Sequence, residues 1–376
     1  MPMSTKPNLR FAIIGCGRVA GNHLTALKEQ PGATLVAVCD IVPDRARAYS
    51  TQFGIPWYED YHTMLQREQV DVVNVITPSG MHPTHVLDVV RTYRKHVVVE
   101  KPLAMKLADI PAMKSAATEA GVKIFPVYQN RYNKAVVAVR KAVSAGALGK
   151  IAMASMRLHW CRPQRYYKLS PWRGTWSMDG GAYTNQGIHY LDLLLHLNGD
   201  VESVYSRIGT QLVTVEVEDT GVAVLRFSNG SLGTVESTTT HRPDDKEASI
   251  TILAENGNCT IAGLAANKLT SWSLDPSLCA TVSEEIPNAY GLGHKLFLAD
   301  VVADLQGIRP HPISFDDGSR AIRLLNALYR SAEDGKPVDL SDNLGSAKFG
   351  RHDEKLFNLY LAPSKKHPSV GDGQRL

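Results

Sequence analysis

The sequence predicts an α/β protein of two domains, an N-terminal doubly wound parallel sheet and a C-terminal α+β domain with a mostly antiparallel, open sheet. Its 376 residues exceed what one hydrophobic core usually serves. The first third alternates short apolar runs with amphipathic stretches, the pattern of βα units in a parallel sheet. After about residue 127, strand-like runs follow one another, and Asn229-Gly230 between two of them is a strong hairpin signal.

The first domain is placed at residues 1–127. Its expected strands are nearly continuously apolar, as parallel strands covered on both faces should be, and they span 9–14, 35–39, 70–76, 96–100 and 123–128. Between them, apolar residues at helical spacing predict helices over 19–29, 44–53, 85–93 and 108–120.

The second domain is placed at residues 128–362. Strands are expected at 151–160, 201–208, 213–217, 221–227, 231–240 and 248–254, and helices at 135–144, 186–197, 293–306 and 319–331. Residues 363–376 are polar and contain Pro and Gly, which predicts a flexible tail.

Composition excludes several classes of protein. The net charge of +4, from 41 basic and 37 acidic residues, is too small to indicate nucleic-acid or membrane binding. The five cysteines are scattered without CxxC spacing, which predicts no metal site and a reduced, cytoplasmic setting. No segment reaches the roughly 18 uninterrupted apolar residues that a membrane span needs, and the start of the chain does not read as a signal peptide.

A glycine turn follows the first strand. Gly15 permits the tight turn, Gly17 lets the backbone approach a pyrophosphate, and the small Ala20 allows close packing of the next helix. Such a pattern alone is equally explained by a turn that merely requires glycine. In this position it predicts a Rossmann dinucleotide site that also includes Arg18 and Val19.

Asp40 strengthens this interpretation. It ends the second strand 20 residues after Ala20, where a carboxylate accepts hydrogen bonds from the adenosine ribose and repels a 2′-phosphate. NAD is therefore expected rather than NADP, although Arg45 and Arg47 lie nearby in sequence and could hold a phosphate.

Two further motifs end strands at the carboxyl edge of the sheet, where open α/β folds bind ligands. Thr77-Pro78 follows one strand, and Glu100-Lys101-Pro102 ends the next. Lys101 could polarise or deprotonate the hydroxyl whose carbon gives up hydride. His82, and His85 beyond it, lack a carboxylate at ligand spacing, so satisfied or exposed histidines are expected rather than a metal site.

In this order, GxGxxA, TPxxxH and EKP followed by a β-rich domain resemble the Gfo/Idh/MocA family of sugar and polyol dehydrogenases. The resemblance implies a catalytic Asp and a His four residues later, on one face of a helix. The matching residues are Asn185 and His189, so a charged side chain is replaced by an amide. His189, as a neutral imidazole, could accept the substrate proton. Asp192 lies on another helical face and is expected to be structural.

Within the family, the sequence is similar to the UDP-N-acetylglucosaminuronate 3-dehydrogenases of the WlbA type. The runs that carry this likeness are residues 162–167, 172–176, 179–189 and 290–294. It implies oxidation at C3 of UDP-2-acetamido-2-deoxy-glucuronate, for surface-polysaccharide synthesis. A substrate with a carboxylate and a diphosphate requires cations, and aromatic faces can cover its rings. The substrate residues expected beside Lys101, Asn185 and His189 are Arg131, Tyr132, Arg162, Arg165 and Tyr166; those expected on the cofactor besides the motifs are Glu100, Gln129, Trp172 and Arg173.

Two alternatives remain at this point. One is a family member that oxidises a free polyol or sugar, such as an inositol dehydrogenase, although Asn185 and the arginine-rich loop disfavour it. The other is a non-catalytic dinucleotide sensor on the same fold, which the presence of both Lys101 and His189 disfavours. The resemblance also implies a homo-oligomer, most simply a tetramer.

Overall fold

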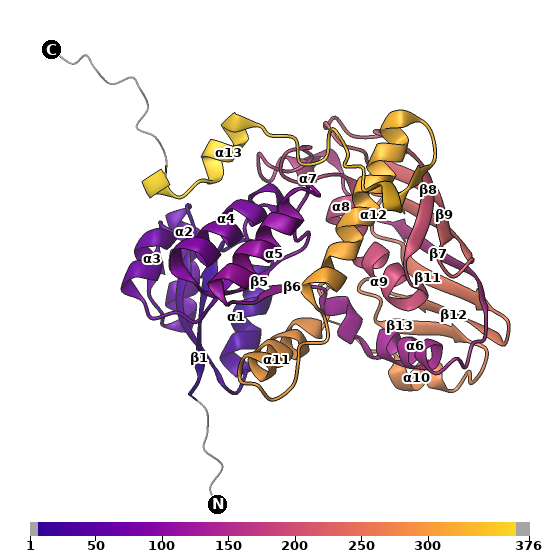
Figure 1. The fold of residues 1–376 in the computed structure, drawn as a ribbon, viewed down its shortest axis with the longest axis horizontal. Helices are drawn as coiled ribbons and strands as arrows, with labels where there is room; N and C mark the ends of the chain where they lie inside the picture. The colour runs from indigo at the N-terminus through magenta and orange to yellow at the C-terminus, as the bar shows by residue number, and fades with distance from the viewer. Residues whose placement is uncertain (1–6, 287, 366–376) are drawn as a thin grey trace, which may run out of the picture.

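The computed structural model describes residues 7–286 and 288–365, and it shows two sheet-based parts side by side (Figure 1). The first is a six-stranded parallel sheet of strand order β3-β2-β1-β4-β5-β6, as a doubly wound fold requires. Its strands are β1 (Leu9–Ile14), β2 (Ala33–Cys39), β3 (Trp57–Tyr58), β4 (Val72–Val75), β5 (His96–Val99) and β6 (Ile124–Pro126).

The helices of this part cover both faces of the sheet (Figure 1). They are α1 (Ala20–Glu29), α2 (Pro43–Phe53), α3 (Tyr61–Arg67), α4 (His82–Asp88) with the π-helical turn η2 (Val89–Tyr93), and α5 (Asp109–Ala120), with short 3-10 turns at η1 (Ser79–Met81) and η3 (Gln129–Tyr132). Local chemistry sets several ends: Pro43 opens α2 and Gly54, at φ +68°, closes it. Asp60 caps α3 by accepting the His62 N–H at 2.7 Å.

The second part contains an eight-stranded sheet of order β13-β12-β11-β7-β10-β9-β8-β14. All its neighbouring strands are antiparallel except β7 and β10, which confirms the predicted mostly antiparallel sheet. The strands are β7 (Ile151–His159), β8 (Val201–Gly209), β9 (Thr220–Phe227), β10 (Leu232–Thr238), β11 (Glu247–Ala254), β12 (Gly257–Ala262), β13 (Lys268–Trp272) and β14 (Val338–Asp339).

Helices pack on one face of this sheet, chiefly the long helices α9 and α12 (Figure 1). The helices of this part are α6 (Lys134–Ser144), α7 (Gln164–Tyr167), α8 (Ala182–Asn185), α9 (Ile188–Asn198), α10 (Leu278–Val282), α11 (Gly293–Leu305), α12 (Phe315–Asp334) and α13 (Glu354–Tyr360), with the turns η4 (Leu340–Asp342) and η5 (Pro363–Lys365). The strands β9 and β10 alternate buried and exposed side chains, so the other face is open.

Some predicted elements differ from the structure. Residues 213–217 form a loop and not a strand, and the backbone there bonds to a side chain at the start of α7: Thr214 N–H donates to Gln164 Oε1 at 2.7 Å. The predicted helix over 186–197 corresponds to α9, which begins only at Ile188, after a break at Gly187 where an added Cβ would lie 2.7 Å from Tyr183 O. Sequence patterns also missed β3, α3, β12, β13, β14 and the short helices.

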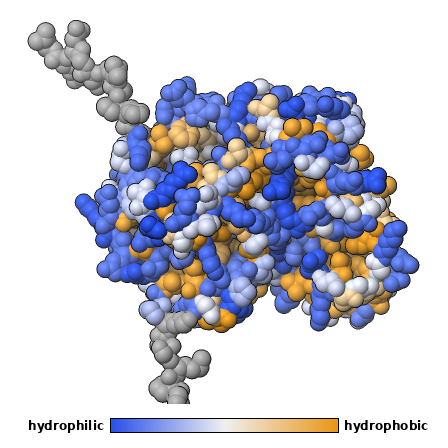
Figure 2. Space-filling view, viewed as in Figure 1, coloured by the Kyte–Doolittle hydropathy of each residue, from blue (hydrophilic) through white to orange (hydrophobic). Residues whose placement is uncertain are grey.

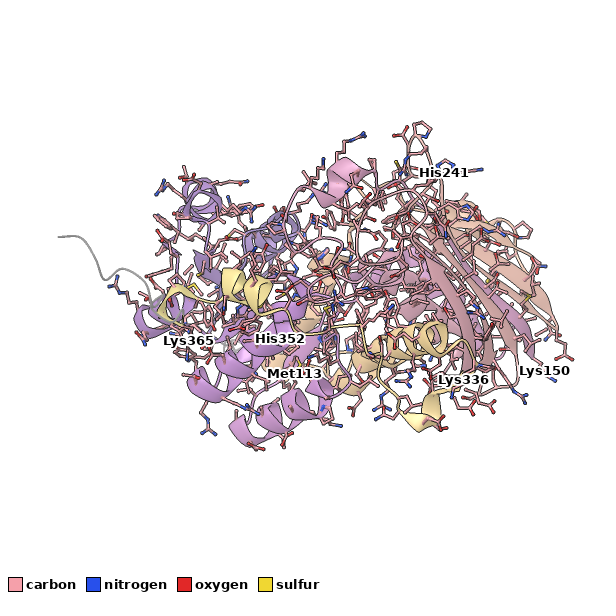
Figure 3. All side chains as sticks on the ribbon, turned by 90° about the horizontal axis from the view of Figure 1, so that it is seen from above. Met113, Lys150, His241, Lys336, His352 and Lys365 are labelled. Atoms are coloured by element: carbon pink, nitrogen blue, oxygen red, sulfur yellow. The ribbon has the colours of Figure 1, made fainter. Side chains whose placement is uncertain are left out.

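The two parts are joined by more than the chain crossing at β6. Helix α11 packs against α1, and Tyr128 Oη donates to Gly318 O in α12 at 3.0 Å. A C-terminal strap, residues 354–365, returns from the second sheet to the first. Figure 3 shows this segment, between His352 and Lys365, beside the helices of the first part and far from Lys150 and Lys336.

The first residues of the predicted tail, 363–376, form the ordered turn η5. Ser364 N–H donates to Asp60 Oδ2 at 2.7 Å. Residues 366–376 of that prediction lie outside the described residues. Hydrophilic residues cover most of the face in Figure 2, and no helix in the described ranges is long and apolar enough to cross a bilayer.

Candidate active site

A cleft of about 280 Å³ lies along the carboxyl edge of the parallel sheet and reaches the second part of the molecule. Fifteen of the residues predicted for the site line it: Gly15, Gly17, Arg18, Val19, Asp40, Thr77, Pro78, His82, Glu100, Lys101, Gln129, Trp172, Arg173, Asn185 and His189. The structure thus brings the three N-terminal motifs together with the predicted pair from the second domain.

The glycine turn has the shape that a dinucleotide needs. Gly15 has φ +99°, and a Cβ there would lie 2.5 Å from Ile76 O, so only glycine fits. A Cβ on Gly17 would meet nothing within 4 Å, so this backbone faces open space in the cleft, where a pyrophosphate can approach. Ala20 opens α1 and is fully buried, so it serves packing and does not line the cleft.

Asp40, the residue expected to bind the adenosine ribose, lines the cleft. Its carboxylate accepts the Cys16 N–H at 2.7 Å and the Val42 N–H at 2.8 Å, which fixes it at the cleft wall with lone pairs free for a ribose. Arg45 also lines the cleft, whereas the Arg47 guanidinium stacks on the Trp57 ring at 4.9 Å. Of the two arginines considered for a 2′-phosphate, one faces the cleft.

The loops after β4 and β5 are tied to each other by His82. This buried ring lies 2.9 Å from Thr77 O through Nε2 and 2.7 Å from Pro102 O through Nδ1. His85 Nδ1 lies 2.9 Å from Thr77 Oγ1. Both histidines therefore have hydrogen-bond partners, as expected, and His82 holds the two strand-end motifs in register.

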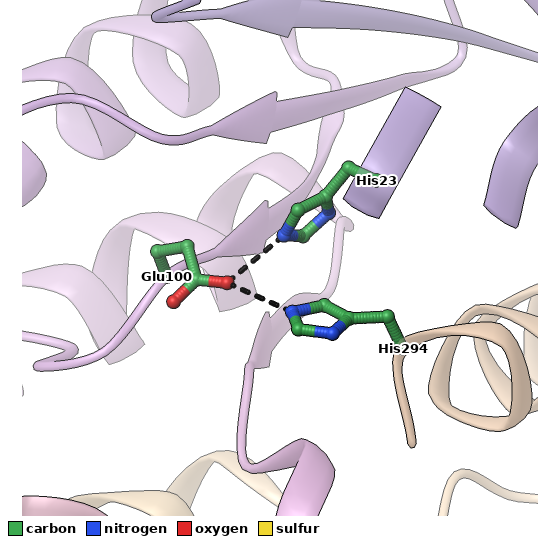
Figure 4. A group of neighbouring side chains, drawn as sticks. All are labelled: His23, Glu100 and His294. Carbon is green, nitrogen blue, oxygen red and sulfur yellow. Dashed lines mark hydrogen bonds and ion pairs between the residues drawn. The ribbon is translucent and has the colours of Figure 1, made fainter. Parts of the chain in front are cut away.

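Glu100 forms a buried polar cluster with His23 and His294, which Figure 4 shows in detail. Its Oε1 lies 2.9 Å from His23 Nε2 and 3.5 Å from His294 Nε2. Burial alone would raise the pKa of Glu100, but hydrogen bonds from the two histidines hold it well below its usual range. The cluster joins β5, α1 and α11, and so the two parts of the molecule.

These three residues also have the composition of a metal site, with ligand atoms within 4.8 Å of one another. However, His23 is already bonded at both ring nitrogens, because Asn74 Nδ2 lies 3.0 Å from its Nδ1. Hydrogen bonds therefore account for the placement of His23, and His294 is held near Glu100 by the 3.5 Å contact.

Lys101 and His189 meet at the inner end of the cleft. Lys101 Nζ donates to Asn185 O at 2.8 Å, and burial lowers the pKa of this lysine while the charges of Glu100 and Asp179 raise it. Burial, and then the charge of Lys101, lower the pKa of His189 to about 3, so its ring is neutral near pH 7. A lysine with a lowered pKa beside a neutral imidazole is suited to move a proton from a substrate hydroxyl.

Arg173 places a cation in this cleft, and aromatic rings hold its guanidinium group. Its guanidinium stacks on the rings of Tyr166 and Trp172 at 4.4 and 4.6 Å, and it donates to Tyr166 Oη. Tyr166 Oη also lies 3.5 Å from Asn185 Oδ1, which places this tyrosine beside the site although it does not line the cleft.

Four predicted substrate residues are placed elsewhere. Arg131 is buried and donates to Asp192 at 2.7 and 2.5 Å and to Asp317, so its guanidinium is not available to a substrate. This contradicts the prediction for Arg131 and confirms the structural role expected for Asp192. Tyr132 donates to Asp300 at 2.9 Å outside the cleft.

The other two lie in the arginine-rich loop. Arg162 pairs with Asp245 at 2.8 Å and stacks on Trp160, while Arg165 is exposed; neither lines the cleft. For Arg162 the physical reason is an acidic partner 83 residues away, which sequence patterns do not reveal.

Several lining residues were not predicted. Tyr290 comes from the turn before α11, and Tyr360 and Ala362 come from the C-terminal strap, for which the sequence carried no signal. Asp179, behind the lining, is buried and accepts a hydrogen bond from Asn185 Nδ2. Its position in the run Asp179-Gly180-Gly181 was a signal, since a carboxylate beside turn glycines is held by backbone N–H groups.

Comparisons with known proteins agree with this geometry. The profile described as "Oxidoreductase family, NAD-binding Rossmann fold" matches residues 9–128, and that of the GFO/IDH/MocA C-terminal domain matches residues 136–260. The WlbA dehydrogenase from Bordetella pertussis, solved with NADH and UDP-GlcNAcA, is 37% identical with a TM-score of 0.82, over 89% of this chain and 98% of that one. The WlbA structure from Chromobacterium violaceum, with the same ligands, is 37% identical with a TM-score of 0.83, over 90% and 98%.

Among curated proteins, the myo-inositol 2-dehydrogenase of Thermotoga maritima is 27% identical over 90% of this chain and all of that protein. The chain belongs to the Gfo/Idh/MocA family of oxidoreductases and is an NAD-dependent sugar dehydrogenase of that family. This confirms the predicted fold, cofactor and enzyme class, and it disfavours a non-catalytic sensor.

Proposed function

We propose that this enzyme oxidises the C3 hydroxyl of UDP-2-acetamido-2-deoxy-D-glucuronate to the 3-keto sugar. The observation that carries the proposal is the meeting of Lys101, Asn185 and His189 in a cleft that is also lined by Arg18 and Arg173. Arg173 Nε is buried and has no hydrogen-bond partner among the described residues, so this cation can serve an anionic group. The 37% identity to two WlbA dehydrogenases crystallised with UDP-GlcNAcA supports this substrate.

The residues of this chain have distinct parts in the reaction. NAD⁺, held by the glycine turn and Asp40, supplies the hydride acceptor. Lys101 Nζ hydrogen-bonds to the C3 oxygen and stabilises the negative charge that develops there as the hydroxyl proton leaves; this charge is lost again when hydride departs from C3 and the carbonyl forms. Lys101 in its amine form takes up the hydroxyl proton, and the neutral ring of His189 accepts a hydrogen bond that orients the hydroxyl group. Arg173 and Arg18, which also line the cleft, contact the anionic groups.

A free polyol is the second candidate substrate, because the inositol dehydrogenases match the chain over most of its length at 26–27% identity. The test is anaerobic incubation of the enzyme with NAD⁺ and either UDP-N-acetylglucosaminuronate or myo-inositol, followed at the NADH absorbance band. Reduction with the UDP-sugar acid alone supports the proposal. Reduction with inositol alone overturns it in favour of the polyol enzyme.

Assembly, location and pathway belong to the same proposal. The open face of the second sheet exposes the apolar side chains Val222, Val224, Leu232 and Leu253, on β9, β10 and β11. Exposed apolar side chains on an open sheet face fit a protein interface, and we expect a homotetramer, measured by light scattering during size-exclusion chromatography. A reduced, cytoplasmic setting and a place in surface-polysaccharide sugar biosynthesis fit a nucleotide-sugar substrate.

A further inference from the structure

Asp179 is a buried carboxylate that the mechanism above does not use. Only 1% of its surface is exposed. Its Oδ2 accepts the Gly174 N–H at 2.7 Å, and its Oδ1 accepts a hydrogen bond from Asn185 Nδ2. Burying a carboxylate is costly, and here one of its two partners is a side chain of the reaction site.

Asn185 is thereby held at three points. Besides the bond to Asp179, its Oδ1 accepts from Gln186 Nε2 at 3.0 Å, and its main-chain oxygen accepts from Lys101 Nζ at 2.8 Å. Lys101 Nζ is thus bonded to the main chain of Asn185, and Asp179 is bonded to its side chain. Asp179 helps to hold in place the residue at the end of α8 to which Lys101 is bonded.

The negative charge of Asp179 also connects it to Lys101, independently of these hydrogen bonds. Glu100, Asp179 and Arg173 are the charged groups that act on Lys101, and Glu100 is already shared with two histidines. Arg173 in turn donates to Tyr166 Oη. Asp179 thus offsets the two cations of the inner cleft from the side of the second sheet, with Tyr166, Tyr167 and Glu218 as the other titratable groups near it.

We propose that Asp179 is a positioning residue for hydride transfer: it orients Asn185, which holds Lys101 Nζ, and its negative charge offsets those of Lys101 and Arg173. This inference rests on the proposed function only in taking Lys101 as the residue at the reacting hydroxyl. Asp179 acts through Asn185 and does not line the cleft.

The test begins with Asp179→Asn, which keeps the shape and removes the charge. We expect kcat to fall about 100-fold, as misplacement of a reacting group does, while NADH binding measured by fluorescence stays unchanged. The pKa of Lys101, measured from the pH dependence of its acylation by mass spectrometry, should fall, because a neighbouring carboxylate stabilises the ammonium form. Asp71→Asn is the matched control, because it removes a carboxylate that is bonded to Arg10 and does not line the cleft. It should change neither kcat nor the pKa of Lys101.

The exchange Asp179→Asn with Asn185→Asp decides between positioning and folding. It restores one carboxylate and one amide in hydrogen-bond contact, so it should recover about tenfold or more of the lost kcat, the usual range of coupling between contacting residues. This second variant also keeps the proposal testable if the single variant does not fold.

Unchanged kcat and unchanged Lys101 pKa in Asp179→Asn would overturn the proposal. Loss of activity without a shift of that pKa, and without recovery in the exchange, would assign Asp179 to holding the Gly174 turn alone and overturn it too. The acylation measurement needs no substrate, so it stays informative if UDP-N-acetylglucosaminuronate is not oxidised.

Discussion

Arg131→Met tests whether this guanidinium serves the fold or the substrate. The change leaves the Asp192 carboxylate, 1% exposed, without its two charged hydrogen bonds. Asp317 keeps a partner in Arg320 at 3.1 Å and is partly exposed, so most of the cost falls on Asp192. Stranding one buried charge in this way costs about 3–5 kcal/mol of unfolding free energy, which urea denaturation followed by fluorescence would measure. The KM for the sugar should stay unchanged.

Two further variants sharpen this prediction. Adding Asp192→Leu to Arg131→Met removes the stranded charge, and should recover about 1–4 kcal/mol relative to the single variant. Arg309→Met breaks a more exposed pair with Asp300 and should cost less than about 1 kcal/mol. A large rise in KM at unchanged stability in Arg131→Met would refute the structural assignment and return Arg131 to the substrate site.

Other predictions follow from the cleft and the core. Lys101→Met and His189→Ala should each lower kcat by about 10²–10⁴-fold while NADH titration gives an unchanged Kd; near-normal turnover in either would remove that residue from the mechanism. Asp40→Ala should shift the ratio of kcat/KM for NADP⁺ over NAD⁺ upward by at least about tenfold, because it removes a repelling charge beside Arg45; an unchanged ratio would show that Asp40 does not contact the ribose. Burial raises the pKa of Glu218 to about 8, so between pH 4.5 and 8 the folded state holds more protons than the unfolded state and stability falls as pH rises. Glu218→Gln should flatten this fall by on the order of 1 kcal/mol per pH unit, measured by urea midpoints at pH 5 and 8, and an unaltered slope would assign the pH dependence to other groups.

The sequence predicts the first domain well because its signals are local. Parallel strands are apolar on both faces, and each motif follows directly from a strand end, so Gly15, Thr77 and Lys101 must meet at one edge of the sheet. The false strand at 213–217 arose from alternating Val and Thr, a pattern that a loop anchored by Gln164 also satisfies. Two-residue strands such as β3 are too short to give a period.

The second half of the site could be predicted only in part. Asn185 and His189 came from resemblance, and the structure places both at the cleft. The arginine-aromatic loop predicted cations for a substrate, but whether an arginine is free depends on carboxylates far along the chain. Arg162 meets a carboxylate 83 residues away and Arg131 meets one 186 residues away, whereas Arg173 meets a tyrosine.

The C-terminal strap has a practical consequence for handling this enzyme. Tyr360 and Ala362 line the cleft together with Asp40, and Ser364 N–H is bonded to Asp60, the cap of α3. A chain shortened to end before residue 354 would lose this wall, and it should therefore exchange its cofactor faster than the full chain. A chain shortened only to residue 365 keeps the wall, and exchange should stay as it is.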